Sequence, residues 1–499
     1  MKRARTALEG SLAGDMNQRN APFLDALATV MRSDAAPFST PGHKRGRGTP
    51  DSFRAVMGGA LSGDVPHAGG VDTTHLSRGL LRQAERLAAG AYGGDEARFL
   101  VNGSTTGNCA MLLATCGTGD IVIVSRTLHT SLLAGIIFSG ARPVYVEPDI
   151  EPERNLPLDI PAHRVQAALA KHPSARAVVL VSPSYVGVTS DLVAIAAICH
   201  QAGVPLLVDE AWGPHFHFHP ALPRSAMQSG ADAAVSSTHK MLSALTQGST
   251  LVARDGVLDL GRLNTAVDML QTTSPSALIF ASLDASRRQM ALDGERLLTQ
   301  AIEHALWLRG EIAGIEGLAT VGPEMIAGRP EAGSDPTRVL IDMHGLGLTG
   351  YEAERVLRDA HGVYVEMSDL LSVMLLVTIG DSAQSVDRAA RAFRALAGER
   401  GEGRHNARSR SSGRLLLGGE QAMTPREAFL APMATVPVEQ ADGRISAEAI
   451  TPYPPGIPLV TPGERLTREA IDYLRGGIAE GMYVSGLSDA TFQTVRVVK

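Results

Sequence analysis

A lysine stands in surroundings that are unusual for a surface charge. Lys240 follows Ser236, Ser237, Thr238 and His239 in SSTHKMLSALTQGS (236–249), which we expect to start a helix. It precedes apolar residues that look buried. A lysine that loses hydration has a lowered pKa, and its free amine can attack an aldehyde cofactor to form a Schiff base. The alternative is a surface lysine whose stem covers apolar neighbours while its charge stays in water.

Two other stretches carry polar residues next to predicted strands. Asp209 ends the apolar run in LLVDEAWGPHF (206–216), where a buried carboxylate needs a cationic partner such as a protonated pyridine nitrogen. VNGSTTGN (101–108) has the glycines and hydroxyls that suit a phosphate held by N–H groups at a helix N-terminus, with the helix expected to begin near Asn108. Ordinary caps and turns have the same composition.

The order of these three features predicts one cofactor. A phosphate cradle comes first, then a strand-end aspartate, then Lys240 31 residues later. Pyridoxal 5'-phosphate needs an anchored phosphate, a protonated ring nitrogen and an amine for its aldehyde. We therefore expect a pyridoxal phosphate site. His129, in SRTLHTS (125–131), follows a strand, and by itself it is more typical of a core or surface histidine.

Alternating strands and helices are expected to position these residues. Short Val-, Ile- and Leu-rich runs predict strands buried on both faces, and amphipathic stretches between them predict helices. Repeated βα units indicate an α/β domain with a mainly parallel sheet, whose ligands bind beyond the carboxyl ends of the strands. The predicted strands are 120–125, 141–147, 175–183 and 203–210, and the predicted helices between them are 158–172 and 191–203.

Further elements follow this domain. A long helix is expected over 283–315, and 336–381 is typical of strand, turn, helix, strand and strand in a small α+β domain. Residues 398–414 have no apolar cluster and favour a flexible linker; an RNA-binding arm is the alternative. We expect five units: an N-terminal arm (1–60), a large cofactor-binding domain (61–320), the small domain (321–397), the linker (398–414) and a C-terminal domain (415–499).

Composition limits the class of protein. The chain has 499 residues, a net charge of -6 and three cysteines. No basic stripe predicts nucleic-acid binding, and the cysteines are too few for a disulfide framework or a zinc site, so we expect no metal. The first residues, MKRARTALEG, lack the apolar stretch of a signal peptide, and no run is long enough to cross a membrane. We expect a cytoplasmic protein.

The sequence resembles the Orn/Lys/Arg decarboxylase family, the fold-type-I pyridoxal phosphate-dependent bacterial decarboxylases of basic amino acids. The resemblance runs in family order from about residue 37 to 465 and follows the short form, which lacks the N-terminal wing domain. Its most specific motif is the long one near the C-terminus, PYPPGIPLVTPGE (452–464). The motifs are PFSTPGHKRG (37–46), FLVNGSTTGN (99–108), SPSYVGV (182–188), VDEAW (208–212), DPTRV (335–339), GLTGYEAE (347–354), MTPREAF (423–429) and PYPPGIPLVTPGE (452–464).

The resemblance implies a role for each matching residue. Lys240 forms the Schiff base, Asp209 pairs with the ring nitrogen, and His129 stacks on the ring. The implied catalytic residues are Lys240, Asp209, His129 and His239. The implied cofactor contacts are Ser104, Thr105, Thr106, Trp212, Ser237 and His239 in addition to Lys240, Asp209 and His129. Two departures are Thr130, where many members have lysine, and Thr73, where an acidic residue is common.

The implied reaction is decarboxylation of a basic L-amino acid, arginine first and then lysine or ornithine, in cytoplasmic polyamine biosynthesis. Glu366, Asp369 and Tyr185 are the expected substrate contacts, and a solvated loop is the alternative for the two carboxylates. Another reaction on the same fold, such as that of an aminotransferase or a lyase, and a non-catalytic regulator remain alternatives.

The resemblance also implies assembly. We expect a homodimer or a multiple of dimers, since the cofactor of this fold type lies at a subunit interface. The glycine-rich arm TPGHKRGRG (40–48) is expected to reach a cofactor region with His43, Lys44 and Arg45, or to serve only as an interface clasp.

Overall fold

The structure, a computed structural model, describes residues 17–66, 79–327, 329, 332–399, 418–453 and 456–499. A central seven-stranded sheet has the order β1-β10-β9-β8-β6-β2-β3. Its five strands from β9 to β3 are parallel, and β10 runs antiparallel to both of its neighbours, β9 and β1. The strands are β1 (Glu96–Leu100), β2 (Ile121–Ser125), β3 (Arg142–Val146), β6 (Ala177–Val181), β8 (Leu206–Asp209), β9 (Ala233–Ser236) and β10 (Ser249–Ala253).

Most of the parallel strands form where continuous apolar runs allow burial on both faces. The edge strand β3 was also predicted to be buried on both faces, but only Val146 in it is buried, because the edge has a neighbour on one side only. Residues 122–125 of β2 and all of β8 are buried, and two large apolar clusters cover opposite faces of the sheet. All four predicted strands are observed, with ends that differ by three residues or fewer. The covering helices are α4 (Leu80–Tyr92), α5 (Gly103–Thr115), α6 (Thr130–Ser139), α7 (Ala162–Lys171), α8 (Leu192–Gln201) and α10 (Leu260–Leu270). The predicted α/β class with a mainly parallel sheet is confirmed.

Two predicted helix boundaries were wrong. Helix α5 begins at Gly103, five residues before Asn108, so VNGSTTGN is largely the first helical turns and not a loop. The expected helix at Lys240 is a single turn, α9 (Thr238–Met241), because Leu242 takes an extended backbone. The chain then passes through a left-handed residue, Gln247, before β10. Met241 and Leu242 are buried, but Leu245 is half exposed.

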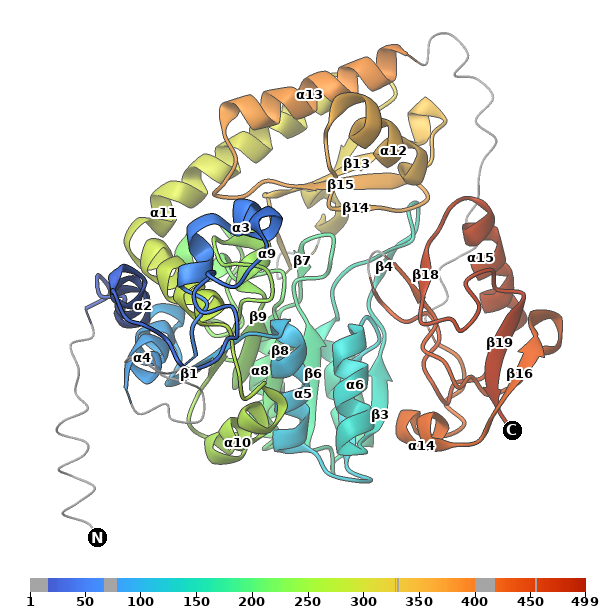
Figure 1. Cartoon of the computed structure of the whole chain (residues 1–499). Coiled ribbons are helices and arrows are strands. Elements are labelled where there is room, and N and C mark those ends of the chain that lie inside the picture. The colour runs from blue at the N-terminus through green and yellow to red at the C-terminus, as the bar shows by residue number, and fades with distance from the viewer. Residues whose placement is uncertain (1–16, 67–78, 328, 330–331, 400–417, 454–455) are drawn as a thin grey trace.

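A second sheet lies beside the first (Figure 1). Its four strands have the order β11-β13-β15-β14, in the predicted pattern of strand, turn, helix, strand and strand. The long helix α11 (Ala277–Ala313) packs on β1 of the large sheet and on β11 and β13 of the small one, so it links the two sheets. The remaining elements here are β11 (Ala319–Val321), β13 (Arg338–Asp342), α12 (Gly350–His361), β14 (Met367–Ser368), β15 (Ser372–Leu376) and α13 (Ala383–Gly398).

The C-terminal residues have their own apolar cluster and pack beside α6 (Figure 1). Arg426 of α14 donates to the carbonyl oxygens of Ile137 and Phe138, which lie on α6. The elements are α14 (Pro425–Leu430), β16 (Met433–Pro437), β17 (Thr451–Pro452), α15 (Arg468–Ala479), β18 (Val484–Ser485) and β19 (Thr494–Val498).

Helix α13 continues through Gly398, the first residue of the predicted linker. Residues 400–414 of that linker, and the departure at Thr73, lie outside the described residues. The five-part division into domains stays a prediction. In the part of the chain that the structure describes, no helix has both the length and the apolar character to cross a membrane.

The N-terminal residues run from α2 (Pro22–Arg32) to α3 (Asp51–Met57). The carboxylate of Asp284 on α11 accepts N–H bonds from Phe23 and Leu24, at the start of α2. Arg287, one turn further along α11, donates to the carbonyl oxygens of Gln18 and Asn20. These bonds fix the beginning of the arm to the large domain.

Candidate active site

A pocket opens at the carboxyl ends of the parallel strands, where ligands bind in α/β sheets. It encloses about 530 Å³ of space that is partly open to solvent. Six of the sequence-predicted residues line it: Ser104, His129, Tyr185, Asp209, Trp212 and Lys240. The other lining residues, which sequence reasoning did not select, are Thr127, Pro157, Val181, Ser184, Ala211, Gly456 and Ile457.

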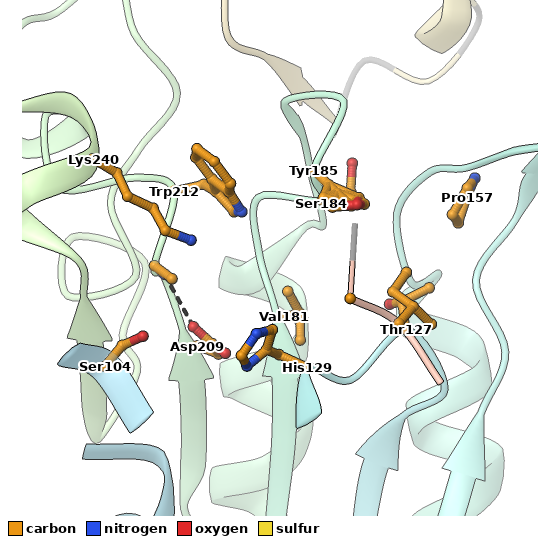
Figure 2. Close-up of a pocket in the computed structure, with 13 residues that line it drawn as sticks. Ser104, Thr127, His129, Pro157, Val181, Ser184, Tyr185, Asp209, Trp212 and Lys240 are labelled. Atoms are coloured by element: carbon orange, nitrogen blue, oxygen red, sulfur yellow. Dashed lines mark hydrogen bonds between the residues drawn. The ribbon is translucent and has the colours of Figure 1, made fainter. Parts of the chain in front are cut away.

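The Lys240 side chain points into this pocket above the Asp209 carboxylate (Figure 2). Its Nζ lies 3.7 Å from the centroid of the Trp212 ring. Burial lowers the pKa of Lys240 to about 8; the charge of Asp209 opposes this effect and that of Arg338 adds to it. The free amine that the sequence predicted is therefore accessible near neutral pH.

Asp209 ends β8 and is 2% exposed. Its Oδ2 accepts a hydrogen bond of 2.7 Å from Nδ2 of Asn108, and its Oδ1 accepts one of 3.1 Å from the N–H of Ala211 (dashed in Figure 2). Asn108, on α5, is fully buried. Sequence reasoning treated it only as a helix start, because nothing local reveals a partner 101 residues away.

His129 caps the N-terminus of α6, with its ring beside Asp209 (Figure 2). Its Nδ1 lies 2.8 Å from Oγ of Ser131 and accepts the N–H of the same residue. Burial lowers the pKa of His129, Asp209 raises it, and Lys240 lowers it further. The histidine is thus held in a fixed orientation at the wall of the pocket. Thr130, the departure from the family pattern, is the first residue of α6.

The predicted phosphate contacts meet at the N-terminus of α5. Oγ of Ser237 donates to Oγ of Ser104 over 3.1 Å, which joins the turn before Lys240 to the first turn of α5. The cap residue Asn102 makes no side-chain cap bond, so its side chain does not occupy the first N–H groups of the helix. Thr105 is exposed on this turn, whereas Thr106 is buried and does not line the pocket.

The remaining predicted residues differ in position. His239 does not line the pocket, and its Nδ1 donates to the carbonyl oxygen of Gly248. Glu366 lies just before β14 and is exposed as a residue, yet partial desolvation of its carboxylate raises the pKa of this group. The charges of Lys240 and Arg338 oppose that rise, so the carboxylate faces the side of the pocket where these two cations lie. Asp369 instead caps its own turn, accepting from the N–H groups of Leu371 and Ser372 and from the Ser372 hydroxyl.

A buried arginine from the DPTRV motif supports two pocket residues from behind. Arg338, at the start of β13, donates to the carbonyl oxygens of Tyr185 and Trp212 and pairs with Asp335. Its guanidinium carbon also lies 4.7 Å from the Trp212 ring centroid. Each of its nitrogens has a partner within the chain, so Arg338 holds the pocket wall in place from the small sheet.

The C-terminal motif forms the opposite wall through Gly456 and Ile457. Arg126, directly after β2 and fully buried, holds this segment. It donates to the carbonyl oxygens of Pro458 and Leu459 and pairs with Glu464 at 3.1 Å. The C-terminal residues are thereby attached to the loop that carries His129.

The basic residues of the N-terminal arm bind within their own chain. His43 pairs with Asp64 at 2.9 Å, and Lys44 donates to the carbonyl oxygen of Ser39. Arg45 donates to carbonyl oxygens at the C-terminal end of α2. None of the three lines the pocket of this chain.

Pyridoxal phosphate fits this site on one observation in particular. Among the described residues, Asp209 has no cationic partner within ion-pair distance, although a buried carboxylate is costly without one. A protonated pyridine nitrogen beside Asp209 supplies that charge. Lys240 and the N-terminus of α5 then border the space where the aldehyde and the phosphate belong. Within the described residues, no group of three His, Cys, Asp or Glu could hold a metal ion.

Comparison with known proteins agrees with this geometry. The family model for the Orn/Lys/Arg decarboxylase major domain matches residues 21–385, and the model for the C-terminal domain matches residues 416–482. The chain is 39% identical over 485 residues to an arginine decarboxylase of Halalkalibacterium halodurans, covering 97% of this chain and 98% of the relative. It is 38% identical over 487 residues to an arginine decarboxylase of Bacillus subtilis, covering 97% and 99%.

Among solved structures, lysine decarboxylase A from Pseudomonas aeruginosa superposes with a TM-score of 0.83 at 25% identity, covering all of this chain and 82% of the other. The family models, the full-length relatives and the solved structures confirm the predicted family, fold class and cofactor. The chain belongs to the Orn/Lys/Arg decarboxylase family and is a pyridoxal phosphate-dependent amino-acid decarboxylase.

Proposed function

We propose that this enzyme decarboxylates L-arginine, with L-lysine and L-ornithine as the next candidates. The observation that carries the proposal is the near full-length likeness to two arginine decarboxylases at 38% and 39% identity, compared with 28% to a lysine decarboxylase of Pseudomonas aeruginosa. The exposed carboxylate of Glu366, in electrostatic range of Lys240, supports it from the structure. A carboxylate suits a guanidinium because the two groups can form paired, charge-assisted hydrogen bonds.

We assign the cofactor contacts as follows. Lys240 binds the aldehyde, Asp209 holds a proton on the ring nitrogen, and His129 lies on the ring. Trp212 restricts the Lys240 stem to one side of the pocket, which is supported by their contact of 3.7 Å. The phosphate contacts are Ser104, Ser237, Thr105 and Thr106 together with the N–H groups of α5. His239 is a catalytic candidate that acts from the turn next to Lys240.

Bound pyridoxal phosphate serves as a sink for the electrons released when the bond between Cα and the carboxylate breaks. The chain's own residues make that possible. Asp209 stabilises positive charge at the ring nitrogen because its carboxylate is buried and held by two donors. Lys240 can accept a proton as the free amine and return it as the ammonium ion, because its lowered pKa of about 8 lets both forms exist near neutral pH.

We propose that Glu366 and Tyr185 contact the substrate's basic side chain. Tyr185 lines the pocket, and within the part of the chain that the structure describes its hydroxyl donates to one weak sulfur acceptor, Sδ of Met367 at 3.8 Å. That hydroxyl is therefore available to a polar ligand. Asp369 acts from behind, by holding the turn that follows β14, since its oxygens already accept three hydrogen bonds.

We also propose a homodimer or a multiple of dimers. Two apolar side chains of the N-terminal arm are strongly exposed, Phe38 at 96% and Val56 at 81%, and such exposure favours a protein interface. A partner subunit that covered them would bring the arm to an interface. The free, buried cysteines fit a reducing compartment, which supports the cytoplasm as the site of action, and we propose polyamine biosynthesis as the setting.

A substrate panel tests the proposal. The purified enzyme with added pyridoxal phosphate is incubated with arginine, lysine and ornithine, and carbon dioxide and amine are measured. We expect the highest kcat/KM with arginine. A higher kcat/KM with lysine or ornithine would overturn the substrate assignment, and formation of a keto acid would point to a different reaction.

A further inference from the structure

A continuous hydrogen-bonded chain joins Asp209 to His129 behind the pocket. Asn108 Nδ2 lies 2.7 Å from Oδ2 of Asp209 and 2.9 Å from Oγ of Ser131, and that Oγ lies 2.8 Å from Nδ1 of His129. Asn108 and Ser131 are 0% and 3% exposed, so water does not compete for these bonds.

Close helix packing places the chain of bonds where it is. A Cβ on Gly107 would lie 2.5 Å from a methyl group of Val235, so glycine lets α5 approach β9, the neighbour of β8. A Cβ on Gly135 would lie 2.6 Å from Cδ1 of Leu112, so glycine also lets α6 approach α5. Asn108 therefore reaches both the strand that carries Asp209 and the helix that His129 caps.

The direction of each hydrogen bond follows from Asp209. An ionised carboxylate only accepts hydrogen bonds, so the Asn108 amide must turn its NH₂ group toward Asp209. The same NH₂ group donates to Oγ of Ser131, and that hydroxyl is left to donate its own proton to Nδ1 of His129. The backbone N–H of Ser131, which can only donate, also points at Nδ1 over 3.2 Å.

Two donors at Nδ1 leave the ring proton on Nε2. A proton on Nδ1 would face the N–H of Ser131, so the chain of bonds disfavours both the Nδ1–H tautomer and the imidazolium ion. Within the described residues, no atom is hydrogen-bonded to Nε2 of His129. The Nε2–H group is therefore free to donate to a ligand in the pocket that His129 lines.

We propose that Asn108 and Ser131 are positioning residues that hold His129 as its neutral Nε2–H tautomer and couple that tautomer to the charge of Asp209. This inference rests on the proposed roles of Asp209 and His129 in the cofactor site. It assigns a purpose to two buried polar residues that do not line the pocket.

The tautomer can be measured directly. We would label the holoenzyme with ¹⁵N-histidine, assign the His129 signals by their loss in His129→Gln, and record the shifts of Nδ1 and Nε2. The expected wild-type result is an unprotonated Nδ1 and a protonated Nε2. A protonated Nδ1, in either the other tautomer or the imidazolium ion, would overturn the proposal without any variant.

Variants separate positioning from general packing. Ser131→Ala removes the hydroxyl donor and leaves only the longer N–H bond at Nδ1, so a fraction of the Nδ1–H tautomer should appear, while kcat falls by up to about tenfold, the scale of one lost hydrogen bond. Ser131→Thr keeps a hydroxyl and should restore both the Nε2–H tautomer and the wild-type kcat. Ser139→Ala, at a buried serine on the same helix whose hydroxyl bonds only locally, is the matched control and should change neither. An unchanged tautomer in Ser131→Ala would contradict the coupling.

The tautomer result and the substrate result are independent. An Nε2–H tautomer in a protein that releases no carbon dioxide from any basic amino acid would refute the proposed function and leave this inference standing. An active arginine decarboxylase with a protonated Nδ1 would refute the inference alone.

Discussion

Nζ of Lys240 lies 3.7 Å from the Trp212 ring centroid, and the guanidinium carbon of Arg338 lies 4.7 Å from the same centroid. Two cationic side chains thus share one aromatic ring at the wall of the pocket. Arg338 is fixed by carbonyl oxygens and Asp335, whereas Lys240 is the group whose charge can change. Its lowered pKa of about 8 connects this geometry to behaviour that depends on pH.

The stability of the cofactor-free protein should reveal that pKa. Between about 8 and the usual 10.5, the unfolded chain binds more protons than the folded chain, so the free energy of unfolding should rise with pH. The gain is at most about 3.5 kcal/mol, at roughly 1.4 kcal/mol per pKa unit. Lys240→Met has no ionisable amine at this position and therefore lacks this pH-dependent contribution to the free energy of unfolding. Wild type should therefore gain stability relative to Lys240→Met from pH 7 to pH 10, as measured by denaturant unfolding, and a constant difference would exclude the lowered pKa.

Tryptophan fluorescence should report cofactor binding. The chain has two tryptophans, and only Trp212 lines the pocket, whereas Trp307 is 42% exposed on α11. Adding pyridoxal phosphate to cofactor-free Trp307→Phe should quench most of the remaining emission. Trp212→Phe is the matched control and should show a much smaller change. Equal quenching in both variants would mean that the cofactor binds elsewhere.

The buried pair of Arg126 and Glu464 should contribute strongly to stability. Arg126→Met leaves Glu464 buried without its partner and removes the donor to two carbonyl oxygens. We expect a loss of about 3–5 kcal/mol in the free energy of unfolding. Arg465→Met breaks the neighbouring exposed pair with Glu420 and should cost about 1 kcal/mol or less. Similar losses in the two variants would show that burial of the pair has little effect.

Glu366 and Asp369 should respond differently to loss of charge. Glu366→Gln should raise KM for arginine roughly ten- to a hundredfold with a smaller effect on stability, since a charge-assisted hydrogen bond is lost. Asp369→Asn should lower stability and leave KM nearly unchanged, because its oxygens serve the turn at Leu371 and Ser372. Steady-state kinetics and thermal unfolding of both variants test this, and an unchanged KM in Glu366→Gln would remove it from the substrate site.

The sequence predicted the elements whose signals are local. Strands β2, β6 and β8 were found because strands buried on both faces are continuous apolar runs. The edge strand β3 has a similar run of residues, although it is only partly buried. Asp209 was found because a carboxylate at the end of such a run needs a partner. Lys240 was found because hydroxyls and a histidine precede it and apolar residues follow it.

Features that depend on distant partners were not predicted. Arg126 meets residues more than 300 positions away, and Asn108 meets Asp209 101 positions away, so neither partner leaves a local pattern. The start of α5 was missed because its glycine, serine and threonine residues are equally typical of a loop. Carbonyl groups and Asp64 of the same chain bind the basic residues of the N-terminal arm, and the predicted approach of this arm to a cofactor region stays a prediction.

The central claim is that Lys240 carries the cofactor. Reduction of the holoenzyme with borohydride should fix pyridoxal phosphate to the chain, and mass spectrometry of the digested protein should locate it on the peptide that contains Lys240. Lys240→Ala, treated in the same way, should retain its fold and carry no label. A label on a different lysine of the wild type, or turnover by Lys240→Ala above a trace, would contradict the account.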